Sequence, residues 1–264
     1  MSAPLLVDSH CHLDYAPMAD DVSGTVARAR SSGVGTLLTI GTKLKDFARV
    51  RSIAEASDNV FCSVGVHPHE AANEAADSER LLELAAHPKV VGIGECGLDY
   101  YYDKSPRDRQ QENFRAHIRA ASQSGLPLIV HTRDADDDMA AMLTDAAAAG
   151  PVKGVLHCFT SSKALAEKAI ELGFYISISG IVTFKNAEGL RDIVRGLPLD
   201  RLLVETDSPF LAPVPMRGKS CEPAYVVHTA AKVAELVGVD RDALAAATTR
   251  NFFTLFDRAK PPPA

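Results

Sequence analysis

Residues 127–157, PLIVHTRDADDDMAAMLTDAAAAGPVKGVLH, show a pattern that recurs along the whole chain. A short apolar run, Pro127–His131, precedes a segment of helical periodicity, Ala135–Ala149, and a second apolar run follows at Gly154–His157. Short apolar strands that alternate with helices are typical of a parallel sheet covered on both faces. We therefore predict a strand, a helix and a second, parallel strand in this stretch.

The same alternation extends outward to both ends of the chain. The segments with strand character are Leu5–His10, Gly35–Ile40, Val60–Val66, Val90–Glu95, Pro127–His131, Gly154–His157, Phe174–Ser179 and Leu202–Glu205. Helical patterns between them include Val22–Ser31, Phe47–Ser57, Arg107–Ser124, Ala135–Ala149 and Lys163–Leu172. Eight strands distinguish a closed α/β barrel of the (β/α)8 (TIM barrel) type from an open sheet, and 264 residues is a typical length for one.

The chain has no internal repeat, low-complexity tract or linker that would divide it. We therefore expect one domain spanning residues 1–264. Two further helices are expected in Glu222–Phe256, and residues 258–264, which include three consecutive prolines, are expected to form a frayed tail.

Charge and cysteine content narrow the functional classes. The formal net charge of −6 argues against a broad electrostatic grip on duplex DNA, although a metal site can supply positive charge locally. Residues 1–6 lack a signal-peptide pattern, and no apolar run approaches the ~20 residues of a membrane span. The five cysteines are widely spaced, which favours reduced thiols. We expect a cytoplasmic protein without a membrane association or an obligate protein partner.

Histidines and carboxylates gather where the predicted strands end, the place where barrel enzymes carry catalytic groups. The candidates for metal ligands are His10, His12, Glu95, His131, His157 and Asp207. His10 and His12 are two residues apart, so on a strand both imidazoles face the same side and can bind one ion. Six ligands are too many for one tetrahedral ion with an open position. They suit two divalent ions bridged by Glu95, because no lysine at a predicted strand end could serve as a carbamylated bridge.

The ordered motifs resemble those of the TatD family of metal-dependent deoxyribonucleases, which lie within the amidohydrolase-like barrels. The motifs are Asp8-Ser-His10-Cys-His12, Gly65-Val-His67-Pro-His69, Gly94-Glu95-Cys-Gly-Leu-Asp99, His131-Thr-Arg133, His157-Cys-Phe159 and Glu205-Thr-Asp207. The resemblance covers nearly the whole chain. It implies that His10 and His12 bind one ion, that His131 and His157 bind the other, and that Glu95 bridges them. It further implies that Asp207 binds the first ion and orients the attacking water.

Three positions depart from the family pattern without removing a ligand. Cys96 stands where an aliphatic residue is more common, Ser161 where a glycine is common, and Cys221 where a polar residue is common. These departures concern the fit of the substrate.

Other residues near the expected ligands are candidates for catalysis and substrate binding. Arg133, Arg217 and Lys219 could hold flanking phosphates. Tyr100, Tyr101, Tyr102 and Phe159 could stack on bases, or the tyrosines could pack their loop against the next helix. Asp207 or Glu205 could accept the proton of the water, although Glu205 could equally orient a ligand by a hydrogen bond.

The remaining histidines and one acidic segment are not expected to bind a metal. His67 is expected to touch a substrate phosphate or a metal-bound water, and His69 to cap its loop. His87, His117 and His228 are expected to be surface or packing residues. Glu70–Glu79 is expected to be a solvated helix face.

We expect an enzyme that cleaves phosphodiester bonds of DNA, an exonuclease that prefers single-stranded ends and activates water with two ions. The alternative on the same fold is hydrolysis of a carbonyl centre, by an amidohydrolase or a D-aminoacyl-tRNA deacylase. A non-catalytic binding module ranks last, because all six ligands are present. Four histidines suit zinc or manganese better than magnesium, although the family resemblance implies that magnesium can also support activity.

Overall fold

The computed structural model describes residues 5–261. The strands in this range are β1 (Leu6–Cys11), β2 (Val34–Thr39), β3 (Val60–Val64), β4 (Val90–Asp99), β5 (Leu128–Arg133), β6 (Gly154–Leu156), β7 (Tyr175–Ile178) and β8 (Leu202–Val204). The α-helices are α1 (Val22–Ser31), α2 (Phe47–Glu55), α3 (Ser78–Ala85), α4 (Arg107–Ser124), α5 (Asp136–Ala149), α6 (Lys163–Glu171), α7 (Glu188–Arg195), α8 (Val226–Val237) and α9 (Arg241–Leu255).

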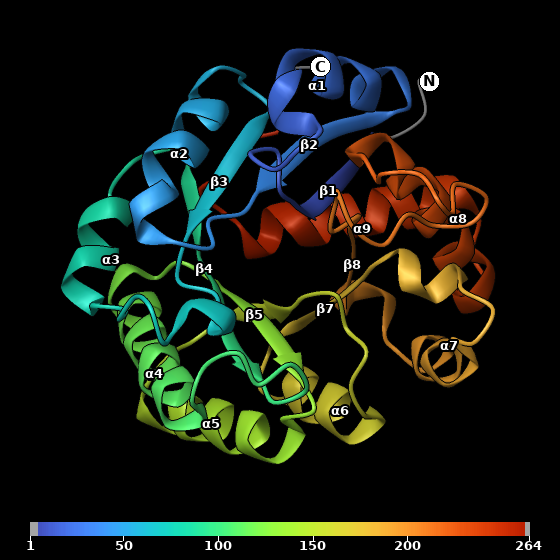
Figure 1. Ribbon diagram of the computed structural model, residues 1–264. Helices are drawn as coiled ribbons and strands as arrows, with labels where there is room; N and C mark the ends of the chain where they lie inside the picture. Colours follow the sequence, from blue (N-terminus) through green and yellow to red (C-terminus); the bar gives the residue numbers. More distant parts are fainter. Residues whose placement is uncertain (1–4, 262–264) are drawn as a thin grey trace.

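The eight strands form one sheet in chain order from β1 to β8, with every neighbouring pair parallel. Figure 1 shows the strands in the centre with the helices packed around them. The backbone after β8 meets β1: the amide of Asp207 donates to the carbonyl of His10 at 2.9 Å, and the amide of His12 donates to Ser208 at 2.8 Å. The sheet is therefore a nearly closed barrel, which confirms the predicted fold class.

Strand β4 runs four residues further than the sequence predicts, so Glu95 lies within the strand instead of at its end. The extension pairs with β5, where Gly97 is opposite His131 and Asp99 is opposite Arg133. Gly97 has a φ of +127°, and a Cβ at this position would lie 2.0 Å from the carbonyl oxygen of His131. A glycine is thus required for this close approach of β4 to β5.

Helix α9 closes the end of the barrel where the strands begin. Each strand contributes one buried residue to an apolar cluster: Val7, Leu38, Phe61, Val91, Ile129, Val155, Tyr175 and Leu203. Phe252, Leu255 and Phe256 pack against this cluster from α9 and the residue after it. The two helices predicted in Glu222–Phe256 are present as α8 and α9. Because α9 fills this end, a cavity can open only where the strands finish.

The end of the chain is held more firmly than the expected tail. The Arg258 guanidinium donates to the carbonyls of Ala85 and Val90 at 2.6 and 2.9 Å, and Ala259 is buried. These two residues therefore do not fray, because Arg258 satisfies carbonyls at the end of α3 and the start of β4. Lys260 and Pro261 are exposed, and the last part of the predicted tail, 262–264, lies outside the described residues, as do residues 1–4. No helix within residues 5–261 is long and apolar enough to cross a membrane.

The acidic segment Glu70–Glu79 is a loop for most of its length, contrary to the predicted helix face, since α3 begins only at Ser78. Its carboxylates bind backbone and lysine groups. Glu74 accepts hydrogen bonds from the amides of Leu44 and Lys45, and Glu70 pairs with Lys43 at 3.1 Å. These contacts hold the segment against the loop after β2.

Candidate metal centre

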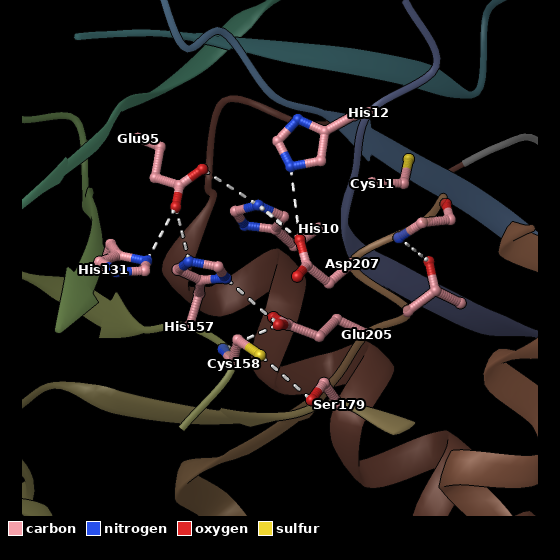
Figure 2. A network of polar contacts seen from close by, with 12 residues as sticks. His10, Cys11, His12, Glu95, His131, His157, Cys158, Ser179, Glu205 and Asp207 are labelled. Atoms are coloured by element: carbon pink, nitrogen blue, oxygen red, sulfur yellow. Dashed lines mark hydrogen bonds and ion pairs between the residues drawn. The ribbon is translucent and has the colours of Figure 1, made fainter. Parts of the chain in front are cut away.

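A cavity of about 540 Å³ opens at the carboxyl ends of the strands, and Glu95 lies among the residues at its floor. Figure 2 shows the Glu95 carboxylate between imidazoles that come from β1, β5 and the end of β6. The two carboxylate oxygens face different groups of side chains. We call these groups the first cluster (His10, His12 and Asp207), in which His10 faces Oε2, and the second cluster (His67, His131 and His157), which faces Oε1.

The first cluster is formed by β1 and the segment after β8. Nε2 of His10 lies 3.4 Å from Oε2 of Glu95 and 3.6 Å from Oδ1 of Asp207. Nε2 of His12 lies 3.4 Å from the same oxygen of Asp207. The backbone hydrogen bonds that close the barrel between β1 and residues 207–208 bring these side chains together.

The second cluster surrounds the other carboxylate oxygen. Oε1 of Glu95 lies 3.2 Å from Nε2 of His67, 3.3 Å from Nδ1 of His131 and 2.8 Å from Nε2 of His157. The ring of His157 also stacks on that of His10 with centroids 3.8 Å apart, so the two clusters adjoin.

Two buried carboxylates, Asp99 in the cavity lining and Glu205 behind it, orient histidines of the second cluster. Oδ2 of Asp99 lies 2.9 Å from Nε2 of His131, and Oε1 of Glu205 lies 3.3 Å from Nδ1 of His157. A carboxylate fixes a proton on the nitrogen that it faces, so the opposite nitrogen, which faces Glu95, is the one that can bind a metal once it has lost its proton. Both histidines are therefore prepared as metal ligands.

His67 is oriented differently. Its Nδ1 accepts a hydrogen bond from the amide of His69 at 3.0 Å, so in the neutral ring the proton is on Nε2, which faces the cavity. Burial lowers the pKa of His67 to about 4, which keeps the ring neutral. The side chain thus offers a hydrogen-bond donor instead of a lone pair. This arrangement also corrects one prediction, since His67 and not His69 caps the loop.

Charge in the centre is concentrated on Glu95. Burial acts to raise the pKa of its carboxyl, but His157, His67 and His10 outweigh this effect and hold the pKa well below its usual range. Burial likewise acts to lower the pKa of His157, and the nearby Glu95 and Glu205 carboxylates raise it well above its usual range. The buried Glu95 carboxylate is thus stabilised by the positive charge of His157 and by hydrogen bonding from the neighbouring imidazoles.

The donor set fits divalent cations. Within the described part of the chain, both ring nitrogens of His10 and Nδ1 of His12 are buried without a hydrogen-bond partner. Such atoms are costly to bury unless something else binds them, and an imidazole lone pair is a common ligand for divalent metals. Three groups of side chains place ligand atoms within 4.8 Å of one another: His10–His12–Glu95, His10–His157–Glu205 and His67–Glu95–His131. The residues present therefore fit metal binding at this centre.

Comparison with known proteins agrees with this chemistry. The family model described as TatD related DNase matches residues 7–257. The chain belongs to the TatD family of metal-dependent hydrolases. It is 50% identical over 254 residues to the uncharacterized metal-dependent hydrolase YcfH of Escherichia coli strain K12, with 95% of each chain covered.

Two further members of the TatD family extend the comparison. The chain is 35% identical over 257 residues to the 3′-5′ ssDNA/RNA exonuclease TatD of Escherichia fergusonii, with 95% of this chain and 98% of the relative covered. Among solved structures, the TatD homologue YjjV of Escherichia coli K12 superposes with a TM-score of 0.88 at 31% identity, covering 96% of this chain and 98% of that one.

The structure brings all six predicted ligand residues of this TatD-family chain to one place. Glu205, predicted as either a proton acceptor or an orienting residue, lies behind them. That side chain is fully buried behind His157, and its Oε1 also accepts a hydrogen bond from the amide of Cys158 at 2.7 Å. It does not line the cavity. Its position favours the orienting role over that of a proton acceptor.

Sequence reasoning assigned no role to Asp99, which links the metal centre to the loop after β4. Its Oδ2 also lies 2.8 Å from Nε2 of His69, and its Oδ1 accepts hydrogen bonds from the amides of Tyr101 and Tyr102. A signal was present in the sequence. Glu95 and Asp99 are four residues apart, so a strand that includes both places them on the same face.

Most of the residues predicted to contact the substrate do not line the cavity. Phe159 is buried in the core, so its ring faces are not available to a base. The Tyr100 hydroxyl donates to Asp138 at 2.6 Å, which attaches the loop to α5. Arg217 packs over the ring of Phe184 at 3.9 Å, and Lys219 is exposed in the same loop outside the cavity lining. Of the predicted cations, Arg133 alone lines the cavity.

Three loop residues line the rim of the cavity: Tyr102, which was among the predicted stacking residues, and Lys104 and Phe210, to which no role was assigned from the sequence. Tyr102 and Lys104 come from the loop after β4, and Phe210 from the loop after β8. The sequence could not distinguish Lys104 and Phe210 from ordinary loop residues, nor Tyr102 from the two tyrosines before it, because nothing in their spacing shows which loop positions face the cavity. His117 is a buried packing residue, as predicted.

Proposed function

We propose that this TatD-family protein hydrolyses phosphodiester bonds at the ends of single-stranded DNA with two divalent ions. The observation that carries the proposal is the position of Glu95, whose two carboxylate oxygens face separate clusters of ligands. Such a carboxylate suits a bridge between two ions, and two-ion centres are typical of phosphoryl-transfer enzymes.

The assignment of ligands follows from the two clusters. His10, His12 and Asp207 would hold the first ion, and His131 with His157 the second. When bound, the ions would supply Lewis acidity that lowers the pKa of a water molecule and neutralises charge on phosphoryl oxygens. Magnesium, manganese or zinc could fill these positions, with the histidines favouring the latter two.

The chain's own groups would divide the remaining work. Asp207 lines the cavity, and although burial opposes ionisation, the neighbouring His12 and His10 hold its pKa below the usual range. As a carboxylate it is able to accept a proton from the attacking water. His67 would donate from Nε2 to an oxygen of the substrate phosphate. Asp99 and Glu205 would keep His131 and His157 in place.

The cavity surroundings support a phosphate substrate. Lys104 and Arg133 lie in its lining, so two cations are available for a flanking phosphate. The TatD relative from E. fergusonii, an exonuclease on single-stranded DNA and RNA, supports the same substrate class. A small amide or an aminoacyl ester, the substrate of the carbonyl alternative, would make less use of these cations. A cytoplasmic location and the lack of an obligate protein partner stay predictions.

The test is digestion of an end-labelled single-stranded oligonucleotide by metal-stripped protein after addition of magnesium, manganese or zinc. We expect stepwise, metal-dependent shortening, and its loss in Glu95→Ala without loss of the fold. Glu70→Gln is the matched control, since Glu70 also lines the cavity but belongs to neither cluster. Full activity of a metal-loaded Glu95→Ala variant would contradict the bridging role. If no metal supports digestion, a carbonyl substrate becomes the better hypothesis and aminoacyl-tRNA the next substrate to test.

A further inference from the structure

Resting on the proposed phosphodiesterase function, we propose that the cavity holds two unpaired nucleobases on opposite walls. The terminal base of the strand lies against Phe210, and the next base lies against Tyr102. The rim of the cavity therefore selects a single-stranded end and sets the direction in which the strand enters.

The two aromatic rings belong to opposite sides of the barrel. Phe210 follows β8, which adjoins β1, and Tyr102 follows β4. In a sheet of eight strands that nearly closes on itself, β8 and β4 lie across from one another. Both rings are half exposed, 50% for Phe210 and 51% for Tyr102, and both line the metal cavity. Exposed aromatic rings at a substrate cavity are suited to stacking on bases.

The Phe210 wall is apolar and rests on the first cluster. The ring of Phe210 makes edge contacts with His12 and Tyr15, each with centroids 6.3 Å apart. Tyr15 in turn stacks on His12 at 4.8 Å. Leu211 and Ile181 complete the lining near Phe210. A base placed on Phe210 would thus lie beside a ligand of the first ion, without a cation to receive a further phosphate.

The Tyr102 wall combines an aromatic ring with positive charge. The ring of Tyr102 makes an edge contact with His69, with centroids 5.4 Å apart. The Arg133 guanidinium lies 4.9 Å from the centre of the Tyr102 ring, and Nζ of Lys104 lies 5.4 Å from it. This wall therefore offers a stacking face and two phosphate-binding groups together.

The unequal distribution of charge determines the direction of the strand. Lys104 and Arg133 are the only lysine and arginine side chains in the described lining of the cavity, and both belong to the Tyr102 wall. Each nucleotide beyond the scissile bond adds one phosphate, so the body of the strand runs along the wall that carries the cations. The Phe210 wall receives the one nucleoside that has no further phosphate to place. This arrangement is that of an exonuclease.

The proposal also accounts for a preference for unpaired ends. Each wall offers a single ring, which needs a free face of one base, whereas the bases of a duplex are stacked and paired with one another. A stacking contact of this kind changes affinity by about 5- to 150-fold when the aromatic residue is replaced by alanine. A duplex end would lose that factor at both walls unless it first frayed.

The experiment pairs protein variants with oligonucleotides that lack one base. The substrates are one single-stranded sequence intact, with an abasic site at the digested terminal position, and with an abasic site at the next position. The proteins are wild type, Phe210→Ala and Tyr102→Ala, with kcat/KM measured for each pair in the presence of the supporting metal. Tyr225→Ala is the control, because Tyr225 is a partly exposed tyrosine beside His228 that does not line the metal cavity.

We expect the losses to be specific to position. Removing the terminal base should lower kcat/KM of the wild type by roughly tenfold and should cost Phe210→Ala nothing further. Removing the next base should likewise lower kcat/KM of the wild type by roughly tenfold and should cost Tyr102→Ala nothing further. Tyr102→Phe should restore the sensitivity, since the ring is what the base contacts. Tyr225→Ala should keep both sensitivities of the wild type.

The possible failures are distinguishable. A wild type that digests no oligonucleotide with any metal overturns the proposed function and this inference with it. A wild type that digests the intact strand while neither variant shows a position-specific loss overturns this inference alone. Reversed positions, with Phe210→Ala insensitive to the inner abasic site, would overturn the assigned direction.

Discussion

Oδ2 of Asp99 lies 2.9 Å from Nε2 of His131. The other ring nitrogen of His131 faces Glu95 at 3.3 Å, so the ring is held between two carboxylates on opposite edges. One carboxylate fixes the proton and the other marks the metal position. The same relationship recurs between Glu205, His157 and Glu95. The TatD-family centre is therefore a set of ligands and a set of residues that orient them.

Asp99→Asn tests this orienting contact. The substitution keeps the shape but removes the charge that holds His131, and loss of such a partner weakens metal binding by about 10- to 100-fold. We expect one of the two ions to bind more weakly in calorimetric titrations of the metal-free protein. Asp138→Asn is the control, because Asp138 bonds the Tyr100 hydroxyl in the same region without touching a ligand. Equal affinities of Asp99→Asn and wild type for both ions would show that His131 needs no such support.

Removal of metal should lower thermal stability. A metal at about 100 times its dissociation constant stabilises the folded state by about 2.7 kcal/mol, or roughly 5–10 °C in Tm for a chain of this size. We expect a chelator to reduce the Tm of the wild type by this amount in differential scanning calorimetry, and to change Glu95→Ala little. An equal chelator effect on both proteins would place the stabilising ion away from Glu95.

His117 should make stability fall in mild acid. Its Nε2 accepts a hydrogen bond from the amide of Val66 and its Nδ1 donates to the carbonyl of Asn113, so the neutral ring is required. Burial lowers its pKa from 6.5 to about 4. Between these values the unfolded chain binds more protons, so folding stability decreases as the pH falls through this window.

The size of this effect is on the order of 3 kcal/mol, from a shift of about two and a half pH units. Urea unfolding at pH 7 and pH 4.5 should show that His117→Gln loses less stability on acidification than the wild type. His228→Gln, a change on α8, should lose as much as the wild type. The same pH response in His117→Gln and wild type would show that other groups cause the acid sensitivity.

Lys104 should contribute to the salt dependence of strand binding. For single strands, log K falls with log salt concentration by about 0.7 per phosphate contact. We expect Lys104→Ala to reduce this slope by about that amount in fluorescence anisotropy titrations of a labelled oligonucleotide. Lys219→Ala should leave the slope unchanged, because Lys219 lies outside the cavity lining. A smaller slope in Lys219→Ala, with no change in Lys104→Ala, would instead support the prediction that the loop after β8 holds a phosphate.

Gly97→Ala should be strongly destabilising. The new Cβ would lie 2.0 Å from the His131 carbonyl oxygen at a backbone φ of +127°. Clash and strain together should cost roughly 3 kcal/mol or more in urea unfolding. Gly189→Ala is the control, since its Cβ meets nothing within 4 Å on α7, and a change between zero and a gain of about 1 kcal/mol is expected there. Equal stability of the two variants would contradict the close approach of β4 and β5.

The barrel and its strand order could be predicted from the sequence alone, and so could the six candidate ligand residues that the structure brings together. This is possible because these features are local or periodic. Alternation of apolar strands with helices identifies a parallel sheet, and parallel strands carry their chemistry at the ends where His10, His131 and His157 stand. Helices with strong end signals have the bounds that the sequence predicts. An example is α4, which follows Pro106 and ends before Gly125.

The surroundings of those six residues depend on tertiary packing. The length of β4 depends on pairing with β5, so Asp99 gained its contact with His131 from a neighbouring strand. Phe159 was drawn into the core and Arg217 onto Phe184, while Phe210 and Tyr102 were left exposed at the cavity. Whether a loop side chain faces a cavity, a core or solvent depends on residues far away in the chain. The spacing of residues within a loop does not show which of these a side chain faces, because tertiary packing determines it.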